Sequence, residues 1–186
     1  FDNHAIDAIA VFFMIIAGTN FTLHFHAWRS MNLYGYFTDY EFKMYLRILI
    51  GICITCCIYL LFKDFYENDV SAITHGIFQT ISIATTTGFT TTSYQNWPTF
   101  LPVLLIFASF MGACAGSTCG GLKVIRILLL YKQGVREIKR LIHPNAIITI
   151  KLGTKPVKES IINAVWGFFA VYTVVFSFLL LLLMAS

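Results

Sequence analysis

Long apolar stretches separated by short polar ones dominate the hydrophobic pattern of this chain. Four of them are apolar enough to cross a bilayer, and they cover residues 8–23, 48–62, 98–122 and 160–186. A membrane-spanning helix needs roughly 20 residues. The second stretch is short for this, so we expect the long side chains of Arg47 and Lys63 at its ends to reach toward the interfaces. The pattern predicts an all-α, polytopic membrane protein.

The composition supports this prediction. Of the 186 residues, 58% are hydrophobic and only 12% are charged. A soluble domain usually carries about 25% charged residues, so an ordinary water-soluble enzyme is nearly excluded. The five cysteines of so apolar a chain do not suggest a disulfide framework. The chain begins without an initiator Met and ends directly after an apolar run, so we expect it to be a fragment of a longer polypeptide.

The charged residues are distributed unevenly, and their positions indicate a topology. Nine of the 13 Lys and Arg residues fall within residues 123–158, where Glu137 and the adjoining Glu159 are the acids. The positive-inside rule places this basic segment in the cytoplasm, at least in its later part. Residues 63–69 are net acidic and fit the outside. The basic segment is mainly a topology signal, with docking of a partner protein as the alternative, and its position argues against binding of nucleic acid.

Residues 70–122 contain no Asp, Glu, Lys or Arg, yet they do not fit one simple helix. Residues 71–84 have apolar side chains at helical spacing, but at about 1.5 Å per residue they are too short to cross a membrane. Residues 85–92 then hold six threonines and Gly88, which is a poor helix interior. The pattern predicts a half-helix that enters from outside and returns as extended backbone. A threonine-rich external loop is the alternative.

The returning segment has the composition of a cation-binding filter. Non-helical backbone at membrane depth is tolerated only where it is buried in protein or lines a watery cavity. Backbone carbonyls around Thr86, Thr87, Gly88 and Phe89 would replace the hydration shell of an alkali cation. The partial negative charge at the end of the half-helix is aimed at the same place. Gly88 permits the φ values that turn a carbonyl toward a pore axis.

Ten consecutive small residues interrupt the third apolar stretch near mid-membrane. They are Gly112, Ala113, Cys114, Ala115, Gly116, Ser117, Thr118, Cys119, Gly120 and Gly121. Four glycines in such a run disfavour a continuous helix, and we predict a mobile constriction on the cytoplasmic side of the filter. A helix-packing face of small residues is the alternative. Lys123 and Arg126 follow closely, as an electrostatic barrier or as donors that hold the loop.

Three smaller features leave their roles open. Asp7 lies at the outer lip of the first stretch, where it would either attract cations or act as a solvated capping acid. His24 and His26 flank Phe25 in a pattern that fits a metal site less well than interfacial polar residues. No set of residues suited to hydrolysis is evident.

Together these motifs resemble the Trk/Ktr/HKT superfamily of potassium transporters, above all its bacterial Trk branch, over nearly the whole chain. Residues 7–21 resemble the second transmembrane helix of that family's second repeat. Residues 85–91 resemble the filter of the third repeat, and residues 112–123 resemble its intramembrane gating loop. The small-residue run after a filter-like glycine is the most specific of these signals. The family often has Gly or Ser near Ala113 and Cys119, and a cysteine preserves the small size.

The resemblance implies potassium uptake across the bacterial inner membrane, not catalysis, through a pore of four membrane–loop–membrane repeats. The expected boundaries are 1–30 for the end of the second repeat, 41–142 for the third and 155–186 for the start of the fourth. Within the third repeat we expect a helix at 44–63, a pore helix at 71–84, a filter at 85–92 and a helix at 98–140 interrupted at 112–121. Potassium would bind at Thr86, Thr87 and Gly88, and the gate would comprise residues 112–121 with Lys123 and Arg126.

The resemblance also implies partners on the cytoplasmic side. The family works as a homodimer bound to a TrkA-like, nucleotide-binding regulatory subunit, and the basic segment at 123–158 is the docking candidate. Potassium is expected as the transported ion, with membrane lipid around the protein and no organic cofactor in this chain. The rival classes are a carrier with broken helices and a membrane-embedded enzyme.

Overall fold

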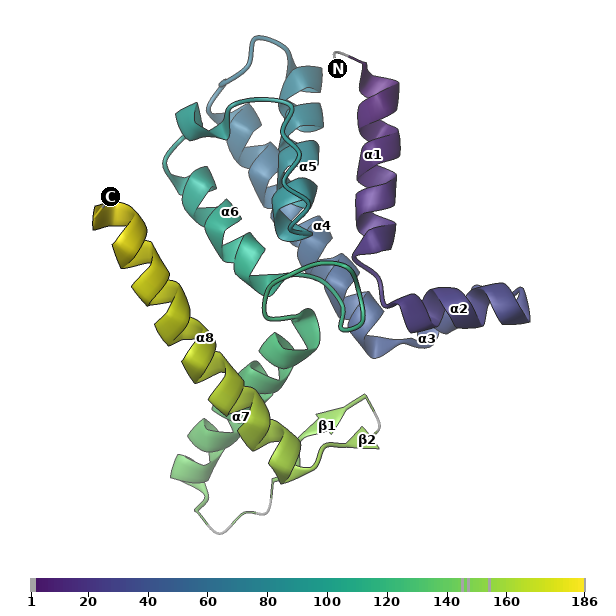
Figure 1. The fold of residues 1–186 in the computed structure, drawn as a ribbon, viewed down its shortest axis with the longest axis vertical. Coiled ribbons are helices and arrows are strands. Elements are labelled where there is room, and N and C mark those ends of the chain that lie inside the picture. Colours follow the sequence, from purple (N-terminus) through teal and green to yellow (C-terminus); the bar gives the residue numbers. More distant parts are fainter. Residues whose placement is uncertain (1–2, 145, 147, 154, 186) are drawn as a thin grey trace. The chain divides into compact units, whose positions relative to one another are not determined.

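The computed structural model describes residues 3–144, 146, 148–153 and 155–185, which form helices and one small sheet (Figure 1). The chain divides after Val124 into two compact units. The first unit contains α1 (His4–Ala17), α2 (Phe21–Ser30), α3 (Tyr34–Thr38), α4 (Tyr40–Phe62), α5 (Asp69–Ala84), a 3-10 turn (Tyr94–Asn96) and α6 (Phe100–Met111). The second contains nearly all of α7 (Val124–Ile142), then β1 (Lys151–Leu152), β2 (Lys155–Pro156) and α8 (Glu159–Ala185).

Asparagine and aspartate side chains fix where four helices of the first unit begin. Asn3 caps α1, Asn20 caps α2, Asp39 caps α4 and Asn68 caps α5, each accepting a hydrogen bond from a backbone N–H of the first turn. Such caps satisfy donors that have no partner inside the helix, and each contributes about 1 kcal/mol. The caps explain why α4 and α5 start earlier than the apolar pattern suggests.

Helices α4 and α8 are long and apolar enough to cross a membrane, with 23 and 27 residues. Helix α4 is therefore longer than the 15-residue apolar stretch that the sequence showed, whereas the reach of the Arg47 and Lys63 side chains toward the interfaces stays a prediction. The helix that starts after Asp39 takes in Glu41, Lys43 and Arg47 before the apolar stretch begins. The fourth stretch forms one helix, as expected.

The first apolar stretch does not form one straight span, which corrects the expectation for residues 8–23. The chain bends by 96° between α1 and α2. The bend occurs at Gly18, Thr19 and Asn20, where Asn20 starts a new helix by accepting from the Thr22 N–H. A Cβ at Gly18 would lie 2.3 Å from the Tyr45 hydroxyl, so the corner needs glycine for close packing.

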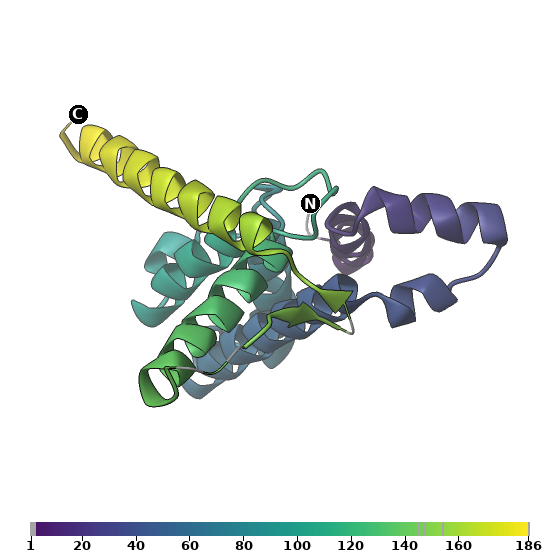
Figure 2. The same ribbon diagram turned by 90° about the horizontal axis from the view of Figure 1, so that it is seen from below.

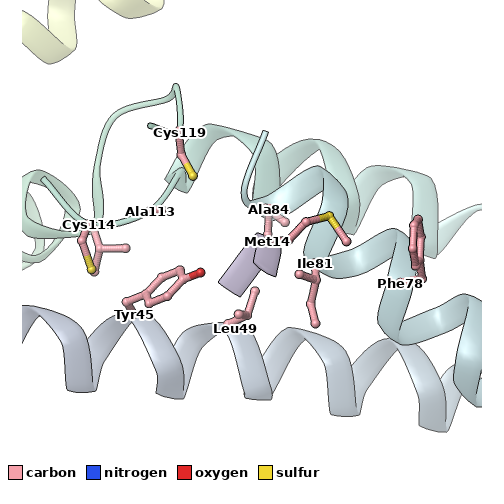
Figure 3. Close-up of a cluster of buried hydrophobic side chains, with 11 residues drawn as sticks. Met14, Tyr45, Leu49, Phe78, Ile81, Ala84, Ala113, Cys114 and Cys119 are labelled. Atoms are coloured by element: carbon pink, nitrogen blue, oxygen red, sulfur yellow. The ribbon is translucent and has the colours of Figure 1, made fainter. Parts of the chain in front are cut away.

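Helix α5 packs against α1, α4 and α6 at the centre of the first unit (Figure 1). Its Phe78 and Ile81 join a buried cluster with Met14 of α1 and with Tyr45 and Leu49 of α4 (Figure 3). A second buried cluster joins α4, α5 and α6 through Cys56, Leu60, Ala72, Leu101 and Leu105. The half-helix predicted from the sequence is thus held on three sides.

The second unit is built on the apolar face of α7. Leu129 packs there with Ile150 from the segment before the hairpin and with Ile162 and Val165 of α8. Arg136 is buried and forms two hydrogen bonds with the Glu159 carboxylate, which raise the pKa of the guanidinium. The hairpin beside the start of α8 was not expected from the sequence (Figures 1 and 2). The prediction of an all-α membrane fold is otherwise confirmed.

Candidate functional site

The threonine segment, residues 85–92, leaves helical form directly after α5. Thr86 has φ +55° and Gly88 has φ +84°, so both lie in the left-handed region. Glycine adopts this conformation freely, whereas a side chain with a Cβ costs roughly 1–2 kcal/mol there. The break expected at residues 85–92 is therefore present, and the left-handed backbone of one of the predicted filter residues, Thr86, was not expected from the sequence.

Polar side chains on one face of α5 hold the threonine segment back against its own helix. The Ser82 carbonyl accepts from the Thr87 N–H at 2.8 Å, and the Ser82 hydroxyl donates to the Phe89 carbonyl at 2.6 Å. Gln79 donates to the Thr92 carbonyl at 2.5 Å. One turn earlier, a ring nitrogen of His75 lies 3.0 Å from the Thr91 hydroxyl. This stripe was missed, although polar residues at i, i+4 and i+7 of an apolar helix are a readable signal.

The carbonyl oxygens of Thr86, Thr87 and Gly88 accept no hydrogen bond from any residue that the structure describes. These three residues are exposed, and their carbonyls lie between the buried end of α5 and the clamped carbonyl of Phe89. The segment thus presents a short run of unused backbone acceptors. Phe89 differs from the other three predicted residues because its carbonyl is already bonded to Ser82.

The glycine loop, residues 112–121, separates α6 from α7, and its two ends approach each other closely. Gly112 and Gly121 have φ +63° and +77°. A Cβ at Gly112 would lie 2.3 Å from the Gly120 carbonyl oxygen, and a Cβ at Gly121 would lie 3.1 Å from that of Phe110. The Leu122 N–H donates to the same Phe110 carbonyl at 3.0 Å. This close approach of Gly112 and Gly121 forms the neck of the glycine loop, and only glycine fits at both positions.

The glycine loop has a buried part and an exposed part. The buried part consists of Gly112, Ala113, Cys114 and Cys119, while Gly116, Thr118 and Gly120 are exposed and Ala115, Ser117 and Gly121 are intermediate. Ala113, Cys114 and Cys119 belong to the same cluster as Tyr45, which points from α4 toward the loop (Figure 3). The two cysteines therefore serve packing in this structure.

Backbone hydrogen bonds join the glycine loop to the corner between α1 and α2. The Cys114 N–H donates to the Gly18 carbonyl at 3.0 Å, and the Phe21 N–H donates to the Gly116 carbonyl at 3.0 Å. The Thr118 hydroxyl donates to the last carbonyl of α1, that of Ala17, at 3.2 Å. The bend in the first stretch thus supplies partners for backbone groups that a helical α6–α7 connection would have satisfied internally.

Two side chains from other elements also bind the loop backbone. The Glu41 carboxylate on α4 accepts from the Ala115 N–H at 2.6 Å. The Thr86 hydroxyl accepts from the Gly120 N–H at 2.7 Å. The second bond links the threonine segment directly to the glycine loop. It is made by Thr86, the residue whose backbone lies in the left-handed region. Neither contact was expected from the sequence.

The predicted basic residues have different surroundings. Lys123 has φ +74°, and its ammonium donates to the Ser117 hydroxyl at 3.3 Å and to the Cys119 carbonyl. Of the two roles left open, the contacts of Lys123 fit that of holding the loop. Arg126 belongs to the second unit, where its guanidinium lies 4.2 Å from the centre of the Phe168 ring.

Two cavities follow α1 alongside the threonine segment. One, of about 390 Å³, is lined by Met14 and Ala17 of α1, Thr86, Thr118 and Cys119, among other residues. The other, of about 580 Å³, lies toward the start of α1 and of α5. Ala10 and Phe89 border both. Exposed surface of the threonine segment and of the glycine loop therefore faces a common space in the first unit.

The His-x-His pattern does not form a metal site in the part of the chain that the structure describes, which contains no group of three or more His, Cys, Asp or Glu suited to a metal ion. The His24 ring is bonded on both sides, at 2.6 Å to the Tyr36 hydroxyl and at 3.0 Å to the Ile16 carbonyl. His24 thus supports the corner between α1 and α2.

Comparisons with known proteins agree with this architecture. A family model for TrkH, described as a cation transport protein, matches residues 1–185. The Trk system potassium uptake protein TrkH of Salmonella typhimurium is 47% identical over 186 residues, which are 100% of this chain and 38% of that protein. The Trk system potassium uptake protein TrkG of Escherichia coli is 34% identical over 183 residues, or 98% of this chain and 38% of that protein.

A solved structure matches the fold over its full extent. The crystal structure of the potassium transporter TrkH from Vibrio parahaemolyticus superposes with a TM-score of 0.94 at 49% identity, covering 100% of this chain and 40% of that one. The chain therefore spans less than half the length of the relatives it matches. These relatives are named as transport proteins, which agrees with the expectation that the function is not enzymatic.

Proposed function

Because this chain belongs to the TrkH family of cation transport proteins, we propose that it forms part of the pore of a potassium uptake protein in the bacterial inner membrane. The relatives named for potassium uptake match the whole chain, and two helices are long enough to span a membrane. The full-length protein would supply the remaining repeats, since this chain carries one complete repeat and its neighbours.

The threonine segment acts as one wall of the selectivity filter. The observation that carries this proposal is the run of unbonded carbonyls at Thr86, Thr87 and Gly88. Carbonyl oxygens can replace the water around a potassium ion, provided that the backbone is held in place. Ser82 and Gln79 supply that support through side chains of the preceding helix. Equivalent segments of the other repeats would complete the ring of ligands.

The glycine loop acts as the gate below the filter. Its exposed residues, Gly116, Thr118 and Gly120, stand where a helix would otherwise continue, and Thr118 borders the cavity that Thr86 also lines. The loop is tied by hydrogen bonds to α1 and the corner after it, to α4 and to the threonine segment. A movement of any of these elements would loosen the loop. Permeation is then passive, and it proceeds when the loop leaves the path.

The regulatory partner binds the basic segment at residues 123–158. Five of its nine Lys and Arg residues lie on α7, the amphipathic helix that follows the glycine loop. A TrkA-like subunit that pulls on α7 would transmit force to the loop through Lys123, which bonds Ser117 and Cys119. The protein assembles as a homodimer around this arrangement.

The filter proposal is tested by replacing Gly88 with serine in the full-length protein, reconstituted in lipid vesicles. A Cβ at Gly88 would meet no described atom within 4 Å, so the change strains the left-handed backbone without a clash inside the chain. We expect the potassium-to-sodium flux ratio to fall. Gly51→Ser on α4 is the matched control, because Gly51 also has open space around it but an ordinary φ. An unchanged flux ratio in Gly88→Ser would contradict the filter assignment.

A further inference from the structure

The cavity of about 580 Å³ is bounded by three elements of the first unit. The first turns of α1 contribute Asn3 and Asp7, α5 contributes Ser71 and His75, and the threonine segment contributes Thr90 and Thr91. These two threonines follow directly on the residues proposed to form the filter. Its lining residues place the cavity at the first turns of α1 and α5. These helix ends adjoin the net acidic residues 63–69 (Figure 1), which fit the outside of the membrane.

Asp7 is the buried carboxylate of this cavity and is only 8% exposed. Among the described residues, no hydrogen bond to its side chain is found, and no nitrogen of Lys, Arg or His lies within 4.0 Å of it. The other buried charged residue, Arg136, is paired with Glu159. The Asp7 oxygens are not among the side-chain atoms that are shut off completely, so they open onto the cavity, and ionisable side chains of this kind in a membrane protein usually mark an ion pathway.

The surroundings of Asp7 suit a monovalent cation that keeps part of its water. The hydroxyl groups of Ser71, Thr90 and Thr91 and the amide of Asn3 line the same cavity as neutral polar groups. A water molecule occupies about 30 Å³ in the liquid, so the cavity has room for an ion with several waters. One carboxylate with neutral oxygens binds potassium weakly, and weak binding lets an ion move on to the next site.

We propose that Asp7 forms an antechamber site for partly hydrated potassium at the outer end of the threonine segment. This inference rests on the proposed transport of potassium through that segment. The site raises the local concentration of the ion before dehydration, and Asp7 supplies the only negative charge that the described lining of the cavity offers. Its removal should therefore weaken apparent affinity and leave the selection step at Thr86, Thr87 and Gly88 intact.

The test measures rubidium uptake against rubidium concentration, with the full-length protein in vesicles. For Asp7→Asn we expect the half-saturating concentration to rise about tenfold, which corresponds to about 1.4 kcal/mol. The maximal rate and the potassium-to-sodium ratio should stay close to wild type. Asp7→Glu keeps the charge and should restore most of the affinity. Thermal unfolding of Asp7→Asn should occur at about the wild-type temperature, because among the described residues the Asp7 side chain makes no hydrogen bond or ion pair that the change would remove.

Asp69→Asn is the matched control. Asp69 also lies in the first turn of a helix of the first unit, α5, but its side chain is exposed. We expect it to change the half-saturating concentration little, and only at low ionic strength, where surface charge acts at a distance. Equal effects of Asp7→Asn and Asp69→Asn, or none from Asp7→Asn, would overturn the antechamber site. Wild-type protein that carries no potassium would overturn the proposed function itself and the site with it.

Discussion

The threonine segment and the glycine loop are both non-helical breaks after a short helix, yet they are held in different ways. The threonine segment is held by Ser82 and Gln79, which belong to the helix just before it. Their partners in the segment are 7 and 13 residues further along the chain. The glycine loop is tied to Glu41, Thr86 and Ala17, which lie 74, 34 and 101 residues from theirs. Support for the threonine segment comes mainly from the helix just before it, whereas the glycine loop, besides its own Lys123 contacts, is held by elements far away in the sequence.

This difference suits the functions that we propose for the two breaks. A filter must keep its carbonyls in register, and clamps from one rigid helix move together with the backbone that they hold. A gate must have two positions, and a loop tied to several elements responds when any of them moves. The single bond between Thr86 and Gly120 then lets the state of the loop reach the filter.

The largest effect is expected at the neck of the glycine loop. In Gly112→Ala the new Cβ would clash with the Gly120 carbonyl in a left-handed backbone, and we expect a loss of about 3 kcal/mol in unfolding free energy. Thermal unfolding of the full-length protein in detergent measures this. Gly51→Ala, with open space and an ordinary φ, should not destabilise. Equal melting temperatures for the two variants would mean that the neck is not tight.

The second largest effect is expected from loss of the hydrogen bond between the Ala115 N–H and the Glu41 carboxylate. Glu41→Ala removes a charged acceptor from the Ala115 N–H, a bond of roughly 2 kcal/mol, so the open fraction of the loop should rise by up to about 30-fold. The measurement is potassium flux by the full-length protein without its regulatory partner. Glu41→Gln keeps an acceptor oxygen and should raise flux much less. If both variants stay as closed as wild type, Glu41 does not hold the gate.

A smaller effect is expected from the bond between the two breaks. Thr86→Val removes the acceptor of the Gly120 N–H at the cost of about 1 kcal/mol, so partner-independent flux should rise about fivefold. Thr86→Ser retains the hydroxyl and serves as the control. Flux that rises equally in both variants would show that the hydrogen bond from the Gly120 N–H to Thr86 does not restrain the gate.

The smallest effect on gating is expected at Ser82, because Ser82 supports the threonine segment and not the glycine loop. Ser82→Ala removes the donor to the Phe89 carbonyl but no tie of the glycine loop. We expect a lower potassium-to-sodium ratio with unchanged partner-independent flux. If Ser82→Ala changed gating and left selectivity unchanged, Ser82 would support the gate and not the filter, which would contradict the comparison.

Local composition was enough to locate both breaks. Six threonines around Gly88 and ten small residues from Gly112 are signals that act within the segment itself, because they weaken helical backbone wherever they occur. The helix ends were predicted less well, since the caps at Asp39 and Asn68 extend helices beyond their apolar stretches. The assignment of ion-binding and gating residues stays a prediction.

The ties of the glycine loop could not be read from the sequence. Each joins residues far apart in the chain, and Glu41 in particular lies among the charged residues before a span, where an acid is ordinary. The bend at Gly18 was hidden for a similar reason. Residues 18–20 can interrupt the helix within an apolar run because another element binds the backbone groups that the bend leaves free. That element is the glycine loop, which binds them through Cys114 and Gly116.

The most direct measurement is anomalous diffraction from the full-length protein crystallised with thallium or rubidium in place of potassium. The account predicts ion density within coordination distance of the carbonyl oxygens of Thr86, Thr87 and Gly88. Ion density elsewhere along the pore with none beside these three carbonyls, in protein that transports the same ion, would contradict it.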